Sequence, residues 1–442
     1  MEEKFPGHAY AGITDVTRPG VGVEPNAVIL HRFAYLERQM LHLMAGSLIH
    51  VPEWEVKFLL GRHLYEDAEH HNLLRKRIGE LRRSERSVDH TPDPALAAVT
   101  DELVRSEDTV ELLAGLYGAI KPALVAAMRA HLEKINPLVD YNTGRVLRLI
   151  LLEEEEHVHT GQHFLESLLE SDAAHGKAAA WQSHLLAYLS AAGGVDGTAE
   201  RTADLPASRS DGQPFKLPLS SRRDERFQVT IPKNPATATA ETGDPTREGL
   251  EQMMWVRFNE MSPAETVGAI LYLEQGKPWD FYYDLARHCW DEVRHAAFGQ
   301  AALEAEGIPI TRNPNWIGFA EMALSSMDPI DAYTHLTVAI EQAAMKYPPG
   351  KRQEYEFCRD VAKHRLMALY QDYDWADEVV HSHFGQEWII KNVFHGDRQA
   401  AIAAGQATVD RRAEFFSKFI NEGVGLDPIS LKSKEKGSAA GY

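Results

Sequence analysis

Apolar residues recur every three to four positions along most of the chain, which is the spacing of one face of an α-helix. In the first half this pattern predicts four long helices, at 26–49, 53–83, 100–135 and 142–169. Pro122 falls inside the third of them, and we expect it to interrupt that helix. No convincing strand pattern accompanies these helices, so the first half predicts a four-helix bundle.

The middle of the chain differs in composition, because residues 193–245 are rich in Gly, Ser, Thr, Pro and Ala and predict a linker. Within it, 226–232 alternates enough to predict one edge strand or an extended stretch. Helical spacing then returns at 247–274, 278–306, 332–345 and 351–392, with an insertion at 308–330 and one more helix after residue 394. The expected fold is all-α, with two tandem bundles joined by a long irregular linker. Its parts are residues 1–192, the linker 193–245, residues 246–430 and a polar tail at 431–442.

An acidic residue precedes a histidine by three positions at four places, two in each half of the chain. The pairs are Asp67 and His70, Glu154 and His157, Glu292 and His295, and Glu378 and His381. Corresponding pairs are 224 or 225 residues apart, which indicates duplication of a unit of roughly 220 residues. Residues three apart lie on one face of a helix, so each pair directs a carboxylate and an imidazole toward one point, as a metal site requires.

Charge and cysteine content narrow the function classes. The chain has 65 acidic and 46 basic residues, and its net charge of −19 disfavours nucleic acid and acidic membrane surfaces as partners. Its two cysteines exclude a disulfide framework and a thiolate metal cluster. The sequence shows no signal-peptide run and no stretch of roughly 18 apolar residues that would cross a membrane. We therefore expect a soluble, cytoplasmic protein.

A bundle with Glu-x-x-His on its second and fourth helices takes one further carboxylate from each of the other two helices when it binds two metal ions. In the second half, Glu265 precedes the turn at 275–278 by about as many residues as Glu292 follows it, so the two side chains should lie at one height. In the last hairpin, Glu341 is the carboxylate upstream of Glu378. The predicted metal-binding and catalytic residues of the second half are Glu265, Glu292, His295, Glu341, Glu378 and His381.

With these residues in bundle order, the second half resembles the ferritin-like di-iron carboxylate superfamily. The resemblance covers the helical core of both halves but not the linker or the insertion. It implies that Glu292 and Glu378 bridge two metal ions, that Glu265 and Glu341 are terminal ligands, and that each histidine binds one ion. Oxygen and imidazole ligands without thiolate suit iron or manganese. Two iron ions are the expected cofactor, with manganese as the alternative.

The first half departs from this pattern at two positions. Glu37 is its expected first-helix ligand, but it precedes Glu265 by 228 residues and is about one helical turn out of step. Alignment of the third helices places Lys121 opposite Glu341. We hypothesise that this site binds one metal or none, with Lys121 replacing the second ion electrostatically. Its expected ligands are Glu37, Asp67, His70, Glu154 and His157.

Neighbouring residues give further expectations. His288 should face the bundle interior one turn from the metal, Asp374 should hydrogen-bond a ligating imidazole, and Glu153 should be exposed. Three glycines follow a motif histidine by four positions and should leave room for a close helix contact or for substrate; they are Gly161, Gly299 and Gly385.

Three classes of function remain open. The resemblance implies an O2-dependent non-haem di-iron oxidase or oxygenase that acts on a small organic molecule by N-oxygenation, hydroxylation or oxidative cleavage. The alternative is an iron-handling ferroxidase or metal-binding protein without an organic substrate, and the third class is a scaffold with remnant sites. The insertion 308–330 is long enough to form a lid. No flavin or nucleotide motif is present, so electrons come from an external donor or from the substrate, and the sequence does not determine the oligomeric state.

Overall fold

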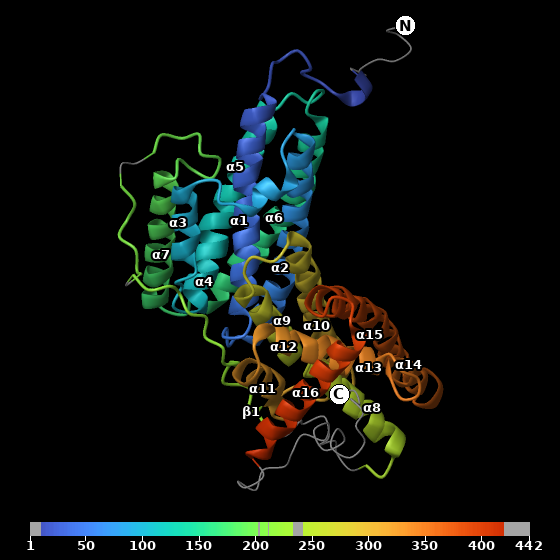
Figure 1. Ribbon diagram of the computed structural model, residues 1–442. Coiled ribbons are helices and arrows are strands. Elements are labelled where there is room, and N and C mark those ends of the chain that lie inside the picture. The colour runs from blue at the N-terminus through green and yellow to red at the C-terminus, as the bar shows by residue number, and fades with distance from the viewer. Residues whose placement is uncertain (1–9, 202–203, 211, 233–241, 420–442) are drawn as a thin grey trace, which may run out of the picture. The chain divides into compact units, whose positions relative to one another are not determined.

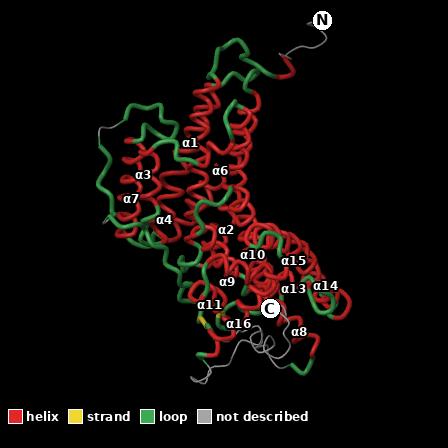
Figure 2. Tube along the Cα trace, viewed as in Figure 1, coloured by secondary structure: helices red, strands yellow, loops and turns green. Residues whose placement is uncertain are grey.

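A computed structural model describes residues 10–201, 204–210, 212–232 and 242–419. Most of these residues are helical and very few form strands, as the ribbon in Figure 1 and the trace in Figure 2 show. The all-α class predicted from the sequence is therefore confirmed. The expected polar tail at 431–442 lies outside the described residues.

The chain divides into two compact units, which we call the N-terminal and the C-terminal unit. The N-terminal unit contains the described residues up to Leu43 together with Glu66–Lys216, and the C-terminal unit contains Met44–Tyr65 and the described residues from Leu217 onward. These boundaries differ from the expected ones, because residues 44–65 group with the second half and the expected linker is divided between the units.

The helices expected at 26–49, 53–83 and 142–169 are present, the one expected at 100–135 is divided at 104–108, and one more helix follows them. The bounds are α1 (Val23–Ser47), α2 (Trp54–Glu80), α3 (Pro94–Leu103), α4 (Thr109–Gly115), α5 (Lys121–Lys134), α6 (Tyr141–Leu168) and α7 (Asp172–Ala191). Short 3-10 turns are η1 (Tyr10–Gly12) and η2 (Glu85–Asp89), and η3 (Leu116–Ile120) is a π-helical turn. In the N-terminal unit α5 packs on α6, while α3 and α4 pack on α7.

Pro122 interrupts the third predicted helix through a π-helical turn rather than a break. The turn η3 joins α4 directly to α5, and Pro122 lies at the start of α5. Proline has no N–H, so the π-type hydrogen bond to the carbonyl of Tyr117, five residues earlier, cannot form. The side chain of Gln162 donates to that carbonyl instead, at 3.1 Å. This contact gives Gln162, which directly follows Gly161, a structural role.

The helices of the second half are shorter than expected because several are interrupted. Their bounds are α8 (Pro245–Phe258), α9 (Met261–Leu273), α10 (Trp279–Ala305), α11 (Gly318–Ser326), α12 (Pro329–Thr334), α13 (Gln342–Ala344), α14 (Lys351–Glu356), α15 (Arg365–Phe384) and α16 (Arg398–Ser417). Three π-helical segments join them, at η5 (His335–Glu341), η6 (Phe357–Val361) and η7 (Gly385–Val393). Helix α10 packs on α8, α9 and α15.

The helix expected at 247–274 ends and restarts at Asn259 and Glu260, between α8 and α9. The side chain of Asn259 donates to the carbonyl of Trp255 and accepts from the backbone N–H of Trp316. These two bonds fix the side chain of Asn259 at the break, between α8 and strand β2. The break changes the direction in which later side chains of this segment point.

The insertion 308–330 and part of the expected linker form ordered structure in the C-terminal unit. Strand β1 (Val229–Thr230) lies within the stretch expected to be extended, and it pairs in parallel with β2 (Asn315–Trp316). Helix α11 follows and packs on α9 and α16, with Phe319 and Met322 buried. The insertion is thus part of the core of this unit.

One helical stretch, Thr109–Lys134, is long and apolar enough to cross a membrane by length and composition. In the structure 61% of its most apolar window is buried inside the protein. Lys121 lies in the middle of this stretch and contacts buried carboxylates. These features are those of a core helix.

Candidate metal centre

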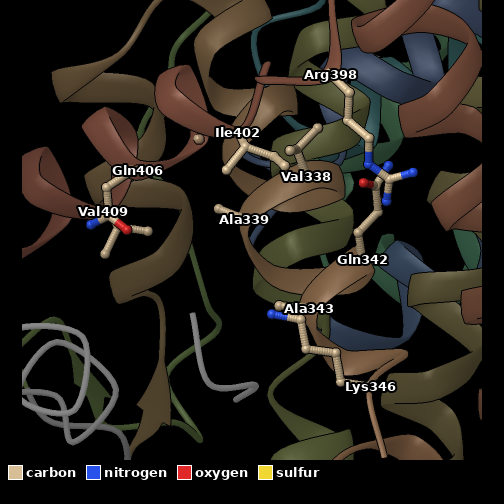
Figure 3. A pocket seen from close by; sticks show the side chains of 10 residues that line it. Val338, Ala339, Gln342, Ala343, Lys346, Arg398, Ile402, Gln406 and Val409 are labelled. Atoms are coloured by element: carbon tan, nitrogen blue, oxygen red, sulfur yellow. The ribbon is translucent and has the colours of Figure 1, made fainter. Parts of the chain in front are cut away.

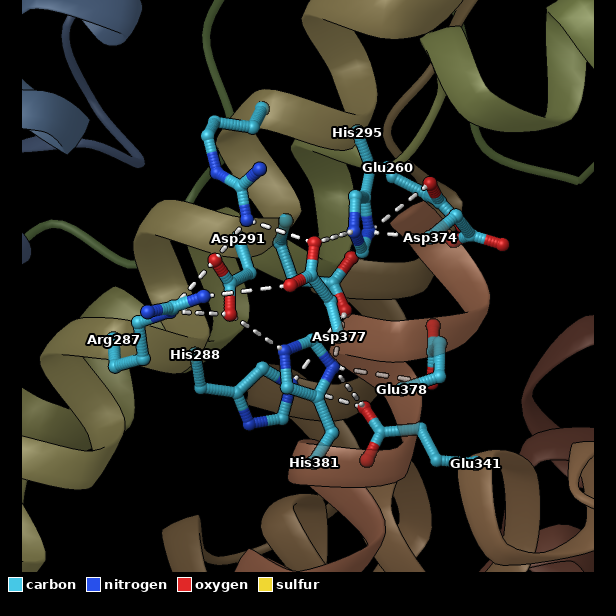
Figure 4. A network of polar contacts seen from close by, with 12 residues as sticks. Glu260, Arg287, His288, Asp291, His295, Glu341, Asp374, Asp377, Glu378 and His381 are labelled. Carbon is cyan, nitrogen blue, oxygen red and sulfur yellow. Dashed lines mark hydrogen bonds and ion pairs between the residues drawn. The ribbon is translucent and has the colours of Figure 1, made fainter. Parts of the chain in front are cut away.

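Two groups of ligand-type side chains lie in the core of the C-terminal unit (Figure 4). The first, the His288 cluster, consists of His288 and Glu292 from α10, Glu341 from η5 and His381 from α15. All four are fully buried, and one potential ligand atom of each lies within 4.8 Å of the others. The shortest contact joins His288 Nε2 to Glu341 Oε1 at 2.9 Å.

Glu292 provides the strongest sign that this cluster is built for a cation. Neither of its carboxylate oxygens accepts a hydrogen bond from the described residues. The nearest imidazole nitrogens belong to His288, at 3.5 Å, and to His381, whose Nδ1 is 3.7 Å away. A fully buried carboxylate without partners is costly, and such groups call for a bound ion or water. The donor set of two carboxylates and two imidazoles fits a divalent ion of the iron or manganese type.

The second group, the Glu260 cluster, consists of Glu260, His295, Asp374 and Glu378, which are all buried. His295 Nδ1 lies 3.6 Å from Glu260 Oε2 and 3.6 Å from Asp374 Oδ1. Glu378 faces both clusters, because its Oε2 atom is also 3.8 Å from Nδ1 of His381 in the first group. The two clusters are therefore adjacent and share α10 and α15.

Basic side chains reach the Glu260 cluster. Lys351 Nζ lies 3.0 Å from Asp374 and 3.0 Å from Glu378, and Arg257 contacts both Glu260 and Asp374. Although burial by itself raises the pKa of Asp374 and of Glu378, these cations hold both below the ordinary value. Burial raises the pKa of Glu260 well above its usual range.

The two motif histidines of these clusters, His295 and His381, are each held from behind by an aspartate on the other helix. His381 Nε2 lies 3.3 Å from Asp291 on α10, and His295 Nε2 lies 3.2 Å from Asp377 on α15. Arg294 contacts both aspartates. When Nε2–H donates to an aspartate, the lone pair of Nδ1 faces the cluster, which is the tautomer a metal ligand needs.

Two of the imidazoles bind protons strongly when no metal is present. Burial alone would lower the pKa of His295, but the hydrogen bond that it donates to Asp377 and the nearby carboxylates raise it to about 9. Burial likewise opposes protonation of His288, yet Glu341 and Glu292 raise its pKa to about 10. A metal ion must displace these protons, so its binding should strengthen with rising pH.

The N-terminal unit contains a related group, the Lys121 cluster. Four of its ligand-type residues lie close together and are buried: Glu37, Asp67, His70 and Glu154. Lys121 Nζ lies 2.7 Å from Asp67, 2.5 Å from Glu154 and 3.2 Å from His157 Nδ1. The ammonium thus lies among the carboxylates, where the sequence comparison placed it. The number of metal ions that this unit binds stays a prediction.

Acidic residues also support the histidines of this cluster from behind. His157 Nε2 lies 2.6 Å from Glu66, and His70 Nε2 lies 2.8 Å from Glu153. Glu153 was expected to be exposed, and about half of its side chain is, but its carboxylate still reaches the imidazole. A signal for these supports exists in the sequence, because an acidic residue directly precedes all four motif carboxylates. The adjacent pairs are Glu66 and Asp67, Glu153 and Glu154, Asp291 and Glu292, and Asp377 and Glu378.

Of the six residues expected to form the second site, the structure brings five into the two clusters. They are Glu292, His295, Glu341, Glu378 and His381. Asp374, expected to support an imidazole from outside, lies within the Glu260 cluster. His288, expected only to face the interior, belongs to the other cluster.

Glu265 is the exception, and its expected place in the site is corrected. Its carboxylate pairs with Lys57 at 2.8 Å and with Arg223 at 2.5 Å, and it accepts a hydrogen bond from Ser221. The helix break before α9 turns Glu265 toward these residues and leaves Glu260 as the carboxylate nearest His295.

The repeat offset could have identified this carboxylate. Glu260 follows Glu37 by 223 residues, which is closer to the common offset of 224 or 225 than the 228 residues that separate Glu37 from Glu265.

A separate pocket of about 220 Å³ lies between α16 and the segment of η5 and α13 (Figure 3). Its lining includes Val338, Gln342, Lys346, Arg398 and Ile402. None of its lining residues belongs to either cluster, although Gln342 directly follows Glu341. The pocket therefore does not by itself identify a substrate site.

The chain matches no protein-family model, no curated protein and no solved structure.

Proposed function

We propose that the C-terminal unit binds two divalent metal ions, iron or manganese, and that the protein is an O2-dependent non-haem di-iron oxidase or oxygenase of a small organic molecule. The observation that carries the proposal is the pair of adjacent buried clusters, in which Glu292 has two carboxylate oxygens without hydrogen bonds. As part of it, we propose that the helices around each unit's cluster form a ferritin-like four-helix bundle, in line with the resemblance of the sequence.

The ligand residues have distinct roles under this proposal. Glu341 and His381 would hold one ion, Glu260 and His295 the other, and Glu292 and Glu378 face the space that the clusters share. When bound, iron would supply the chemistry by which O2 reacts. The protein would keep the site dry, because all of these side chains are buried.

Residues around the ligands would fix their orientation and protonation. Asp291 and Asp377 hold the Nε2 protons of the two motif histidines. His288 Nδ1 lies 3.1 Å from the hydroxyl of Tyr333, so that phenol can exchange a proton with the cluster through this imidazole. Electrons would come from an external donor or from the substrate.

Matched glutamine variants test metal binding. Glu292→Gln and Glu260→Gln should each lower the metal content of the purified protein, because each removes a ligand charge from a cluster. Glu265→Gln removes an equally buried carboxylate outside the clusters and should keep its metal, although it should destabilise the fold by about 3–5 kcal/mol because Lys57 and Arg223 lose their partner. Metal analysis and denaturant unfolding measure the two effects.

Oxygen uptake separates the two functions that such a site supports. An oxidase or oxygenase should consume O2 at a rate that depends on an organic molecule. Uptake with ferrous ion alone, unaffected by any organic compound, would support the iron-handling alternative. Equal metal content in the wild type and in the Glu292→Gln and Glu260→Gln variants would contradict both.

A further inference from the structure

The two clusters of the C-terminal unit differ in the cations that reach them. In the Glu260 cluster, Lys351 Nζ lies 3.0 Å from each carboxylate oxygen of Asp374 and 3.0 Å from Glu378 Oε1. Arg257 Nη1 lies 3.0 Å from Glu260 and also binds Asp374. Both cations are about 1% exposed, so water screens these contacts little.

The His288 cluster has no such cation. In the described part of the chain, no lysine or arginine lies within 4 Å of the carboxylates of Glu292 or Glu341, and their only charged-type neighbours are the imidazoles of His288 and His381. None of the four carboxylate oxygens of Glu292 and Glu341 accepts a hydrogen bond from a residue that the structure describes. The two clusters therefore offer a metal ion very different electrostatic environments.

Formal charges show the size of the difference. Three carboxylates and two cations leave the Glu260 cluster with a net charge of −1 when its imidazole is neutral. With both imidazoles neutral, as metal binding requires, two carboxylates leave the His288 cluster with −2, which balances one divalent ion. An ammonium about 3 Å from two ligand carboxylates also occupies space near a metal ion bound to them.

We propose that the two positions fill in order, with the His288 cluster binding a metal ion tightly and Lys351 holding the place of the second ion at the Glu260 cluster. This inference rests on the proposed function, since it concerns how the same centre is loaded. A second ion then binds only as the Lys351 ammonium moves away from Asp374 and Glu378. The number of bound ions is thus set by a side chain of the protein itself.

The N-terminal unit uses a lysine in the same way, but from a different position. There Lys121 begins α5, the helix aligned with the one that carries Glu341, and its ammonium contacts Asp67 and Glu154. In the C-terminal unit the lysine is the first residue of α14. A buried ammonium at the motif carboxylate of the last helix is therefore common to both units, at Glu154 and at Glu378.

Titration of the metal-free full-length protein with Co²⁺, followed by its visible absorption, tests the order of filling. The wild type should bind one equivalent tightly at the C-terminal unit and a second one more weakly. Lys351→Met should tighten that second equivalent about tenfold or more, because the competing charge is gone. Lys351→Arg keeps the charge and should behave like the wild type. Lys346→Met removes an exposed lysine of the same unit and serves as the control.

The N-terminal unit contributes equally to all of these proteins, so its metal cancels in the comparison. Lys351→Met is folded if it still binds the first equivalent of Co²⁺ tightly and unfolds in a cooperative thermal transition. If this variant does not fold, Lys351→Gln is used in its place. Two equivalents of equal affinity in the wild type, or no tightening in the folded variant, would overturn the inference. If His381→Ala kept all of its metal, the proposed metal centre itself would be overturned. The two failures are therefore distinguishable.

Discussion

At the scale of single residues, this protein buries carboxylates in three different ways. Glu265 is neutralised by Lys57 and Arg223, Glu154 is paired with an ammonium among other ligand-type groups, and Glu292 has no hydrogen-bonding partner in the described residues. A buried charge is tolerated only when something compensates it. The first arrangement is complete within the protein, whereas the last one fits the metal ion that we propose.

Lys57 gives a pH-dependent test of the Glu265 arrangement. Burial lowers the pKa of Lys57 from 10.5 to about 8, although Glu265 opposes the shift. Between these values the unfolded chain binds the proton that the folded protein has released, so the free energy of unfolding rises with pH. From pH 7.5 to 9.5 the wild type should gain about 2 kcal/mol relative to Lys57→Met, a variant without this titration.

Urea unfolding of both proteins at the two pH values measures this change. A stability difference between them that stays constant with pH, or that shrinks, would contradict the lowered pKa of Lys57.

At the scale of secondary-structure elements, interruptions of the helices position the ligands. Glu260 lies at the break between α8 and α9, and Glu341 is the last residue of the π-helical segment η5. Lys121, which aligns with Glu341 in the repeat, directly follows the π-helical turn η3. Such turns are frequent at functional sites because they redirect one side chain without ending the helix.

Gly299 holds the break region against α10. A Cβ atom at this position would lie 2.0 Å from the backbone nitrogen of Phe258 and 2.7 Å from the carbonyl carbon of Arg257. Backbone atoms cannot yield as a side chain can, so Gly299→Ala should displace α8 and cost about 1–3 kcal/mol of stability. It should also lower metal content, since Glu260 follows α8 directly.

Gly405→Ala is the matched control, because the nearest atoms to its Cβ would be 3.5 Å away and alanine favours a helix. This variant should be neutral or slightly stabilised by thermal unfolding. If Gly299→Ala were equally stable and kept its metal, close packing of α8 on α10 would not be needed to place Glu260.

At the scale of the whole molecule, the two units should depend differently on metal. The N-terminal unit has Lys121 among its carboxylates, whereas in the described residues no lysine or arginine contacts the carboxylates of the His288 cluster. Without metal, these buried carboxylates have only the cluster imidazoles to compensate them, so metal removal should cost more in the C-terminal unit.

Chelation by EDTA tests this difference. At a free metal concentration of a hundred to a thousand times Kd, bound metal should contribute about 3–4 kcal/mol, so its removal should lower the thermal midpoint. Amide hydrogen exchange should then rise more in α10 and α15 than in α6. Helices α10 and α15 carry proposed ligands of the C-terminal unit, whereas α6 belongs to the N-terminal unit. Equal loss of protection in both units would contradict unequal dependence on metal.

The sequence alone determined what depends on spacing within one helix. Apolar periodicity predicted the helical class and most helices, since every turn repeats the same local geometry. Of the pairs three residues apart, Asp67 and His70 lie in one cluster, whereas Glu378 and His381 lie in adjacent ones, and the aligned repeat placed Lys121 beside the carboxylates of its unit.

Only the tertiary structure decided which side chains from separate helices meet. The break at Asn259 made Glu260 the neighbour of His295 and turned Glu265 toward Lys57, a residue more than 200 positions earlier in the chain. The packing of the helices also brought Lys351 to the Glu260 cluster. Contacts between helices depend on where each helix bends and how it packs. One altered turn redirects every side chain after it. The spacing of residues along the chain does not record such bends.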